Sequence, residues 1–209
     1  ELLRRAGDPQ KELAFIHIAG TNGKGSVSAF LSNILMAAGY RVGRYNSPTI
    51  RTYRERICVN KSMISKTALC RLLTQLKTCC DEMVADGFAH PTSFEVETVL
   101  GFLYYKEKNC DMVVLETGMG GRLDATNVIP DPQKLLAVFA SVSMDHMAFL
   151  GDSLGQIAKE KAGIITQGCS VVTMEQREEV MDVFQKVCLE KQAVLTVSKP
   201  ETASSIHYG

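Results

Sequence analysis

The sequence has no excess of charge of either sign: 23 lysines and arginines balance 23 aspartates and glutamates over 209 residues. A protein that binds polyanions usually carries a basic excess, so we do not expect nucleic acid as a partner. No apolar run approaches the roughly 20 residues that cross a bilayer. The first five residues, ELLRR, lack the apolar stretch of a signal peptide. We therefore expect a cytoplasmic protein without a membrane partner.

Paired cysteines are also missing. The seven cysteines are odd in number, only Cys79 and Cys80 are close in sequence, and no Cys-x-x-Cys motif occurs. This spacing fits neither a disulfide framework nor a zinc site. Free, buried thiols in a reducing cytosol are the simplest interpretation. Repeats and low-complexity tracts are absent too, and the length fits one large domain or two small ones.

Short apolar runs alternate with helical patterns along the whole chain. Strands are expected at 15–19, 41–46, 55–59, 111–115, 135–142, 170–174 and 193–197, and helices at 26–38, 65–85, 91–108, 153–161 and 176–190. Apolar strands separated by helices predict an α/β fold with a mostly parallel sheet and helices on both faces. In such sheets, ligands bind at the carboxyl ends of the strands.

A glycine-rich turn, GTNGKGS at residues 20–26, follows the first expected strand and opens a helix. Its glycines let backbone amides turn toward an anion, and the helix N-terminus adds partial positive charge. Lys24 can reach the β- and γ-phosphates, and the Ser26 hydroxyl can ligate Mg²⁺. The match to the common phosphate loop is imperfect, because Ile18 replaces its first glycine and Gly25 separates the lysine from the serine. The turn still predicts phosphate binding.

Three further residues are candidates for metal chemistry. Glu116 ends an apolar strand, where a carboxylate can hold Mg²⁺ beside a phosphate loop. His146 follows the strand expected at 135–142 and is as easily structural as a ligand. Lys161 adjoins an apolar stretch. The pattern favours a surface lysine with a snorkelling chain, but a desolvated amine of lowered pKa could instead add CO₂ and become a carbamate.

Taken together, these segments resemble the folylpolyglutamate synthase and dihydrofolate synthase family, a branch of the Mur ligases. The similar segments are 16–26, 46–48, 54–57, 92–95, 116–127, 145–146 with 150–151, and 157–164. They occur in the family's order from near residue 3 to beyond residue 170, and the string at 120–127 is the most specific. The strings at 92–95 and 122–127 favour folate over peptidoglycan substrates.

The resemblance implies a P-loop NTPase-like Mur ligase central domain and assigns roles to particular residues. ATP would contact Thr21, Asn22, Gly23, Lys24, Gly25 and Ser26. Two Mg²⁺ ions would be held by Ser26, Ser47, Glu116, His146 and a carbamylated Lys161. The substrate would contact Pro48, Thr92, Phe94, Arg122 and Asp124. Lys24, Glu116, His146 and Lys161 would be the catalytic residues. One departure is Thr49, where the family commonly carries histidine.

The chemistry implied by the resemblance is ligation of L-glutamate to a folate or dihydropteroate carboxylate. ATP would activate the carboxylate as an acyl phosphate, and the amine of glutamate would displace the phosphate, so no protein nucleophile is needed. A Mur-type peptidoglycan ligase and a non-catalytic nucleotide-binding module remain alternatives. The family carries a second, Rossmann-like domain. We expect residues 1–209 to form the ATP-binding part without that C-terminal domain, to be monomeric, and to be inactive as a ligase alone.

Overall fold

The computed structural model describes residues 1–144 and 151–199. Within this part, eight strands form a single sheet in the order β4-β3-β2-β5-β1-β6-β7-β8. Every neighbouring pair from β2 to β8 is parallel, whereas β3 pairs antiparallel with β2 and β4. The predicted α/β fold with a mostly parallel sheet is confirmed. The strands are β1 Phe15–Ala19, β2 Val42–Tyr45, β3 Ile57–Val59, β4 Ser62–Met63, β5 Met112–Glu116, β6 Lys134–Phe139, β7 Ser170–Met174 and β8 Val194–Ser198.

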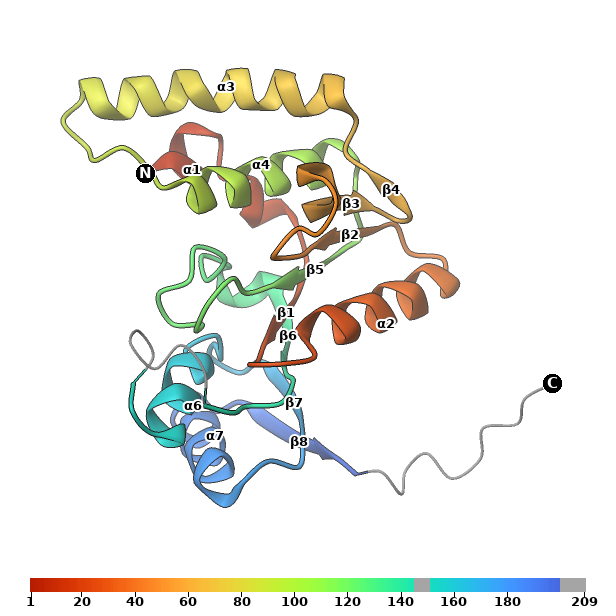
Figure 1. The fold of residues 1–209 in the computed structure, drawn as a ribbon, viewed down its shortest axis with the longest axis vertical. Coiled ribbons are helices and arrows are strands. Elements are labelled where there is room, and N and C mark those ends of the chain that lie inside the picture. Colours follow the sequence, from red (N-terminus) through yellow and green to blue (C-terminus); the bar gives the residue numbers. More distant parts are fainter. Residues whose placement is uncertain (145–150, 200–209) are drawn as a thin grey trace.

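Helices cover both faces of this sheet (Figure 1). The α-helices are α1 Leu2–Arg5, α2 Lys24–Ala37, α3 Lys66–Ala85, α4 Ser93–Glu107, α6 Leu154–Ala162 and α7 Glu178–Glu190. Three 3₁₀-helices, η1 Pro9–Glu12, η2 Tyr53–Arg56 and η3 Asp131–Gln133, lie in the connections. None of the helices in the described ranges is long and apolar enough to cross a membrane.

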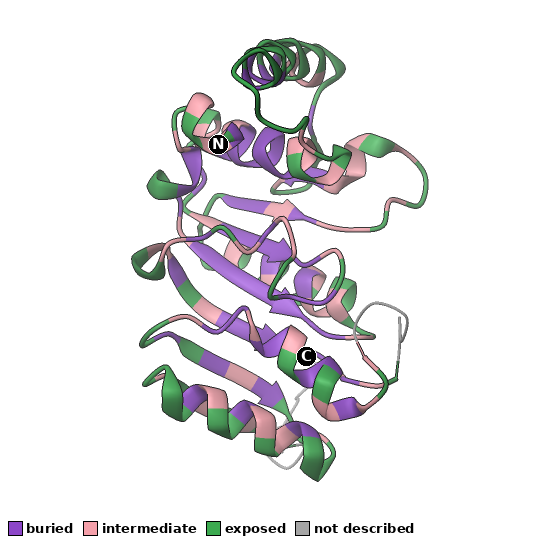
Figure 2. Ribbon diagram, turned by 90° about the vertical axis from the view of Figure 1, so that its left-hand side faces the viewer, coloured by how far each residue is buried: buried purple, intermediate pink, exposed green. Residues whose placement is uncertain are grey.

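Alternation along β1 divides the core between the two faces. Ile16 and Ile18 pack beneath α2 on one face. Phe15 faces the other side, in the cluster formed with α4 and α3, and Ala19 lies on that same side among residues of α6 and α7. Figure 2 shows the buried strands passing through the middle of the molecule. The central strands are therefore buried on both faces, and their carboxyl ends share one edge of the sheet.

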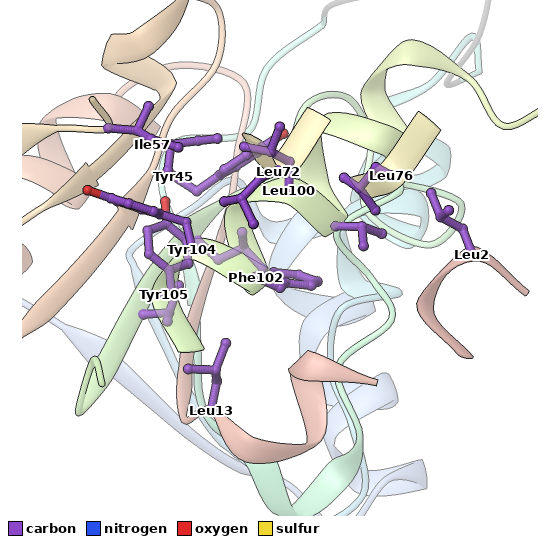
Figure 3. Packing of buried hydrophobic residues seen from close by; sticks show 14 of the residues in the cluster. Leu2, Leu13, Tyr45, Ile57, Leu72, Leu76, Leu100, Phe102, Tyr104 and Tyr105 are labelled. Carbon is purple, nitrogen blue, oxygen red and sulfur yellow. The ribbon is translucent and has the colours of Figure 1, made fainter. Parts of the chain in front are cut away.

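The largest cluster lies where α4 and α3 cover the β2 half of the sheet (Figure 3). Phe102 of α4 meets Phe15 of β1 edge to face, with ring centroids 5.2 Å apart. Leu76 of α3 is completely buried in the same cluster. This packing fixes α4, whose first turn lies beside the sheet edge where β2 and β5 end.

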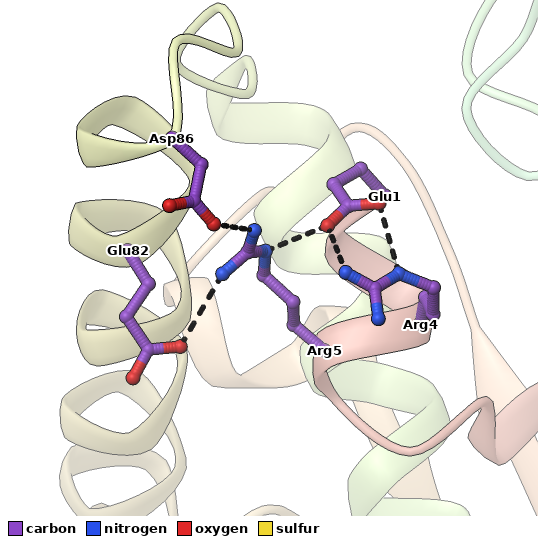
Figure 4. Close-up of polar contacts among 5 residues, drawn as sticks. All are labelled: Glu1, Arg4, Arg5, Glu82 and Asp86. Carbon is purple, nitrogen blue, oxygen red and sulfur yellow. Dashed lines mark hydrogen bonds and ion pairs between the residues drawn. The ribbon is translucent and has the colours of Figure 1, made fainter.

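Arg5 joins the N-terminal helix to the end of α3 (Figure 4). Its guanidinium pairs with Glu1 of the N-terminal turn and with Glu82 and Asp86 of the α3 terminus. Ion pairs at the protein surface contribute little to stability. The network therefore orients α1 against α3 more than it stabilises the fold.

The expected elements differ from the structure mainly at their ends. Helix α2 begins at Lys24, two residues earlier than expected, and the strand expected at 55–59 is shortened by η2. Strand β6 ends at Phe139 instead of residue 142, because Ser141 turns to the glycine-rich loop and its carbonyl accepts from the amides of Thr21 and Asn22. Strand β4 was not predicted.

Candidate active site

The glycine-rich loop is held against the end of β6 by backbone and side-chain contacts. The Thr21 amide donates to the Ser141 carbonyl at 2.7 Å. The Thr21 hydroxyl donates to the Ser143 carbonyl at 3.0 Å and accepts from the Ser143 amide at 3.1 Å. A Cβ at Gly20 would lie 2.8 Å from the Cβ of Ala140, so only glycine allows the loop to approach β6 this closely.

Lys24 occupies the first position of α2. The preceding Gly23 has the left-handed conformation (φ +86°), which turns the chain from the loop into the helix. The first amides of a helix have no partner within it and carry partial positive charge, so they attract an anion. The Lys24 ammonium folds back over the loop and donates to the carbonyls of Gly20 at 3.1 Å and Thr21 at 3.5 Å. The loop and the lysine together can hold phosphate.

A cavity of about 540 Å³ opens beside this loop. It is lined by Thr21, Asn22, Gly23, Lys24, Gly25, Arg44, Asn46, Ser47, Pro48, Ile50, Glu55 and Glu116. The predicted ATP-binding residues from Thr21 to Gly25 thus face the same space as Ser47 and Glu116. Ser26 is exposed and borders a neighbouring apolar cavity of about 410 Å³, which shares Asn22 and Gly23 with the phosphate cavity.

Glu116 is the acidic group of the phosphate cavity. It is only 4% exposed, and this burial raises the pKa of its carboxyl to about 7, although the charge of Lys24 and the amide of Ser47 act to lower it. Nearby, the Ser47 hydroxyl is buried and finds no hydrogen-bond partner among the described residues.

A cation would satisfy both of these groups. A divalent ion would stabilise the ionised form of the Glu116 carboxylate, which burial alone disfavours. The oxygen of the unpartnered Ser47 hydroxyl could also coordinate the ion. Both are hard oxygen ligands of the kind that Mg²⁺ prefers, and Mg²⁺ commonly takes only one or two carboxylates together with phosphate and water. Within residues 1–144 and 151–199, no group of three His, Cys, Asp or Glu side chains is gathered closely enough to hold a metal. Ser47 and Glu116 therefore fit Mg²⁺ as partners of a bound phosphate.

Lys161 lies near the end of α6 and is 3% exposed. Its Nζ donates to the Gly20 carbonyl at 3.0 Å, so the residue reaches the base of the phosphate loop. The interpretation of Lys161 as a surface lysine is wrong for this chain, because α6 buries Lys161 together with Ile157 and Ala158. His146, the other candidate metal ligand, lies outside the described residues.

A second cavity, of about 530 Å³, lies between the start of α4 and the loop that follows β5. It is lined by Ser47, Pro48, Arg56, Thr92, Phe94, Glu95, Gly118, Met119, Leu123, Asp124 and Ala125. The predicted substrate residues Pro48, Thr92, Phe94 and Asp124 are thus brought together. A capping box fixes the first turn of α4: the Thr92 amide donates to Glu95 at 2.6 Å, and the Glu95 amide donates back to the Thr92 hydroxyl at 3.3 Å.

Gly118 and Asp124 shape the opposite wall of this second cavity. A Cβ at Gly118 would lie 2.6 Å from the Phe94 ring, so glycine lets the loop pack against that ring. The Asp124 carboxylate accepts from the Met119 amide at 2.8 Å, from the Thr126 amide at 3.0 Å and from the Thr126 hydroxyl at 2.5 Å. Asp124 is therefore a fixed acceptor on a wall that is otherwise largely apolar.

Arg56 is a cavity residue that the sequence reasoning did not assign. Its guanidinium pairs with Glu97 and lies 5.5 Å from the Phe94 ring centroid and 5.9 Å from that of Tyr45. The guanidinium, with its charge balanced by Glu97, packs over the Phe94 ring in the cavity wall. The signal in the sequence was the RERI string at 54–57, which was noted for its resemblance only.

Arg122 takes a different position from the other predicted substrate residues. It is exposed, and its Nε donates to Glu160 of α6 at 3.0 Å. It borders a third cavity of about 450 Å³, beside the N-terminal turn and His90, instead of the 530 Å³ cavity.

The 530 Å³ and 540 Å³ cavities share Ser47 and Pro48 in their walls. A cavity that holds the Phe94 ring and a fixed acceptor, Asp124, therefore adjoins the cavity of the phosphate loop with its buried carboxylate. Such a pair of sites suits an ATP-dependent enzyme that brings an elongated second substrate to the phosphates.

Comparison with known proteins agrees with this geometry. Residues 18–208 match the family model described as the Mur ligase middle domain. The chain is 42% identical over 186 residues to the dihydrofolate synthase/folylpolyglutamate synthase of Bacillus subtilis, covering 88% of this chain and 43% of that one. An FPGS–AMPPCP complex is similar with a TM-score of 0.90 and 33% identity, over 94% of this chain and 48% of that one. An FPGS–AMPPCP–folate complex is similar with a TM-score of 0.89 and 33% identity, over 94% of this chain and 47% of that one.

The chain belongs to the Mur ligase family. Within it, these relatives and structures are folylpolyglutamate or dihydrofolate synthases, the branch that the sequence motifs indicated. The chain spans less than half the length of each of them.

Proposed function

We propose that this chain is the ATP-binding part of a ligase that joins L-glutamate to the carboxylate of a folate or dihydropteroate through an acyl phosphate. The observation that carries the proposal is the shared wall at Ser47 and Pro48 between the two cavities. A flat heteroaromatic ring bound beside Phe94 and Asp124 would direct its carboxylate tail toward the phosphate cavity. The tail is the reacting group, and the ring supplies binding energy and orientation.

Particular residues have distinct roles in this proposal. The amides from Thr21 to Gly25 bind the phosphates, and Lys24 leaves the loop carbonyls to pair with phosphate oxygens as charge moves onto them. Asp124 accepts hydrogen bonds from ring N–H groups, and the Phe94 face stacks on the ring. Arg56 and Pro48 border the path from the ring to the tail.

Mg²⁺ supplies charge neutralisation and orientation of the phosphates when it is bound. We propose Ser26, Ser47, Glu116, His146 and a carbamylated Lys161 as the residues that hold two ions. Support comes from the buried Glu116 carboxyl and the unpartnered Ser47 hydroxyl. Carbamylation of Lys161 is supported by its burial beside the phosphate loop, where its Nζ reaches the Gly20 carbonyl.

We also propose that residues 1–209 require a second, Rossmann-like domain to complete the glutamate site. The shorter span of this chain against its relatives supports this proposal. A monomer in a reducing cytosol is the expected context, and the seven free cysteines fit it. The isolated fragment is then expected to bind nucleotide weakly and to ligate slowly, and the full-length protein to restore turnover.

The test is ADP release by full-length protein, with three substrates offered separately. Dihydropteroate and tetrahydrofolate are each supplied with L-glutamate, and a UDP-muramoyl substrate is supplied with its amino acid. We expect stimulation by one or both pteridine substrates. Stimulation by the muramoyl substrate alone would assign a peptidoglycan ligase instead. Nucleotide binding without ADP release in any arm would indicate a non-catalytic module.

A further inference from the structure

A histidine lies in the middle of the central strand, where neighbouring side chains are apolar. His17 of β1 is completely buried, between the adjacent strands β5 and β6. Burial, and then the charge of Lys134, hold the pKa of its imidazole well below the usual value, so the ring is neutral. A buried neutral imidazole needs partners for its two ring nitrogens, since an unpaired buried polar atom is costly.

The hydrogen bonds of His17 run to the wall of the 530 Å³ cavity. His17 Nε2 lies 2.9 Å from the hydroxyl oxygen of Thr126, which is itself completely buried. The Thr126 hydroxyl donates its single proton to the Asp124 carboxylate at 2.5 Å. The hydroxyl can then only accept from His17, so Nε2 carries the imidazole proton. Nδ1 is left as an acceptor, and no described residue bonds to it.

This chain of donors has a defined direction and a defined end. It starts at a rigid strand in the sheet, passes through one hydroxyl, and ends on the carboxylate that faces the cavity. The Met119 amide holds the other carboxylate oxygen at 2.8 Å. An apolar side chain of similar size would fill the same layer of the sheet without leaving a ring nitrogen unpaired. The specific contribution of His17 is therefore its bond to Thr126.

We propose that His17 is a positioning residue for substrate recognition: through Thr126 it fixes the Asp124 carboxylate in the orientation that accepts the N–H groups of a pteridine ring. This inference rests on the proposed function, in which Asp124 contacts the substrate. His17 touches neither substrate nor nucleotide. Its effect is on the affinity for the pteridine, separate from ATP binding at the loop that begins three residues later at Gly20.

The test compares removal of each donor with conservative replacements in the full-length protein. His17→Leu and Thr126→Val remove the donors, whereas Thr126→Ser keeps the hydroxyl and His17→Gln keeps an N–H near the position of Nε2. Because one hydrogen bond to a charged group is weakened, we expect the two removals to raise KM for dihydropteroate or tetrahydrofolate about 5- to 20-fold. KM for ATP should stay within about twofold, and the conservative variants should recover most of the loss.

Thr173→Val is the matched control for the deletion of a buried hydroxyl. Thr173 of β7 is 1% exposed, and its hydroxyl oxygen lies 3.0 Å from the Met174 carbonyl and 3.4 Å from the Phe139 carbonyl. It also accepts from Gln176 Nε2 at 3.2 Å, and it does not line the 530 Å³ cavity. This variant should lower the free energy of unfolding without changing KM for the pteridine. If His17→Leu and Thr126→Val behave like this control, or raise both KM values alike, the positioning role is refuted.

Calorimetric binding of dihydropteroate separates this inference from the proposed function. If the wild-type protein binds dihydropteroate without substrate-dependent ADP release, the proposed reaction is overturned. The positioning role of His17 is then judged from the binding measurements alone. Equal dissociation constants for wild type, His17→Leu and Thr126→Val would overturn the positioning role of His17. Absence of binding of both dihydropteroate and tetrahydrofolate by the wild type would overturn both.

Discussion

Replacing Glu116 with glutamine should make the metal-free protein more stable at pH 8. Burial raises the pKa of the Glu116 carboxyl from 4.5 to about 7, so ionising it in the folded state costs free energy. At ~1.4 kcal/mol per pKa unit, the difference corresponds to about 3 kcal/mol. Glutamine resembles the protonated acid in shape and carries no charge. The Glu116→Gln protein should therefore gain up to about 3 kcal/mol in its free energy of unfolding at pH 8.

The raised pKa of Glu116 also determines how the stability gain of Glu116→Gln depends on pH. The folded-state pKa lies above the unfolded value, so the folded protein holds the proton more tightly between pH 4.5 and about 7. The contribution of Glu116 to wild-type stability is greatest below that window and falls as pH rises through it. The advantage of Glu116→Gln should accordingly shrink below about 1 kcal/mol at pH 5. Glu190→Gln, at the exposed end of α7, is the control for loss of one negative charge.

Urea unfolding in EDTA at pH 5 and pH 8 measures both values. A second measurement adds Mg²⁺ and ADP at pH 8, which should stabilise the wild type and have little effect on Glu116→Gln. An equal gain at both pH values, or no gain at pH 8, would refute the reasoning about burial. Unchanged stabilisation by Mg²⁺ and ADP would refute the assignment of Glu116 as a metal ligand.

Three further outcomes are expected. Lys24→Met should weaken ADP binding at least about tenfold, because a charged donor to phosphate is lost; calorimetry showing equal affinity would contradict this. Burial lowers the pKa of Lys134 to about 8, so wild-type stability should rise between about pH 8 and 10.5, since the unfolded state binds more protons there; urea unfolding should show no such rise in Lys134→Met. Gly121→Ala should lower the free energy of unfolding by about 1–3 kcal/mol, because the new Cβ would lie 2.7 Å from the Lys161 carbonyl. The control is Gly155→Ala, whose new Cβ meets only the flexible Glu179 side chain, and thermal unfolding should show a much smaller loss of stability for it.

The fold was predictable where local pattern and burial coincide. Strand β1 has the predicted bounds because five consecutive buried residues end at a glycine turn. The error at β6 has a different origin. Residues 140–142 are apolar enough to read as strand, but Ser141 bonds the phosphate loop at Thr21 and Asn22 instead of extending the sheet. Partners that distant in sequence leave no periodic signal.

The candidate site was predictable to a similar depth. Residue type and strand-end position were enough to place Lys24 and Glu116 in one cavity. They did not reveal the burial of Lys161, since an amphipathic helix pattern does not say how deep a long side chain lies. The link from His17 to Asp124 was missed because it joins residues 107 positions apart in the printed sequence, through a loop without regular structure.

The attachment of Thr21 to Ser141 and Ser143 bears on how the nucleotide would associate. Many anion sites must order a flexible loop at the moment of capture, which consumes binding energy. Here the backbone amides are pre-organised by a strand end 120 residues further along the sequence. When a triphosphate binds, little more than the Lys24 ammonium would have to change its hydrogen-bond partners. Such a rearrangement is fast and has a small entropic penalty.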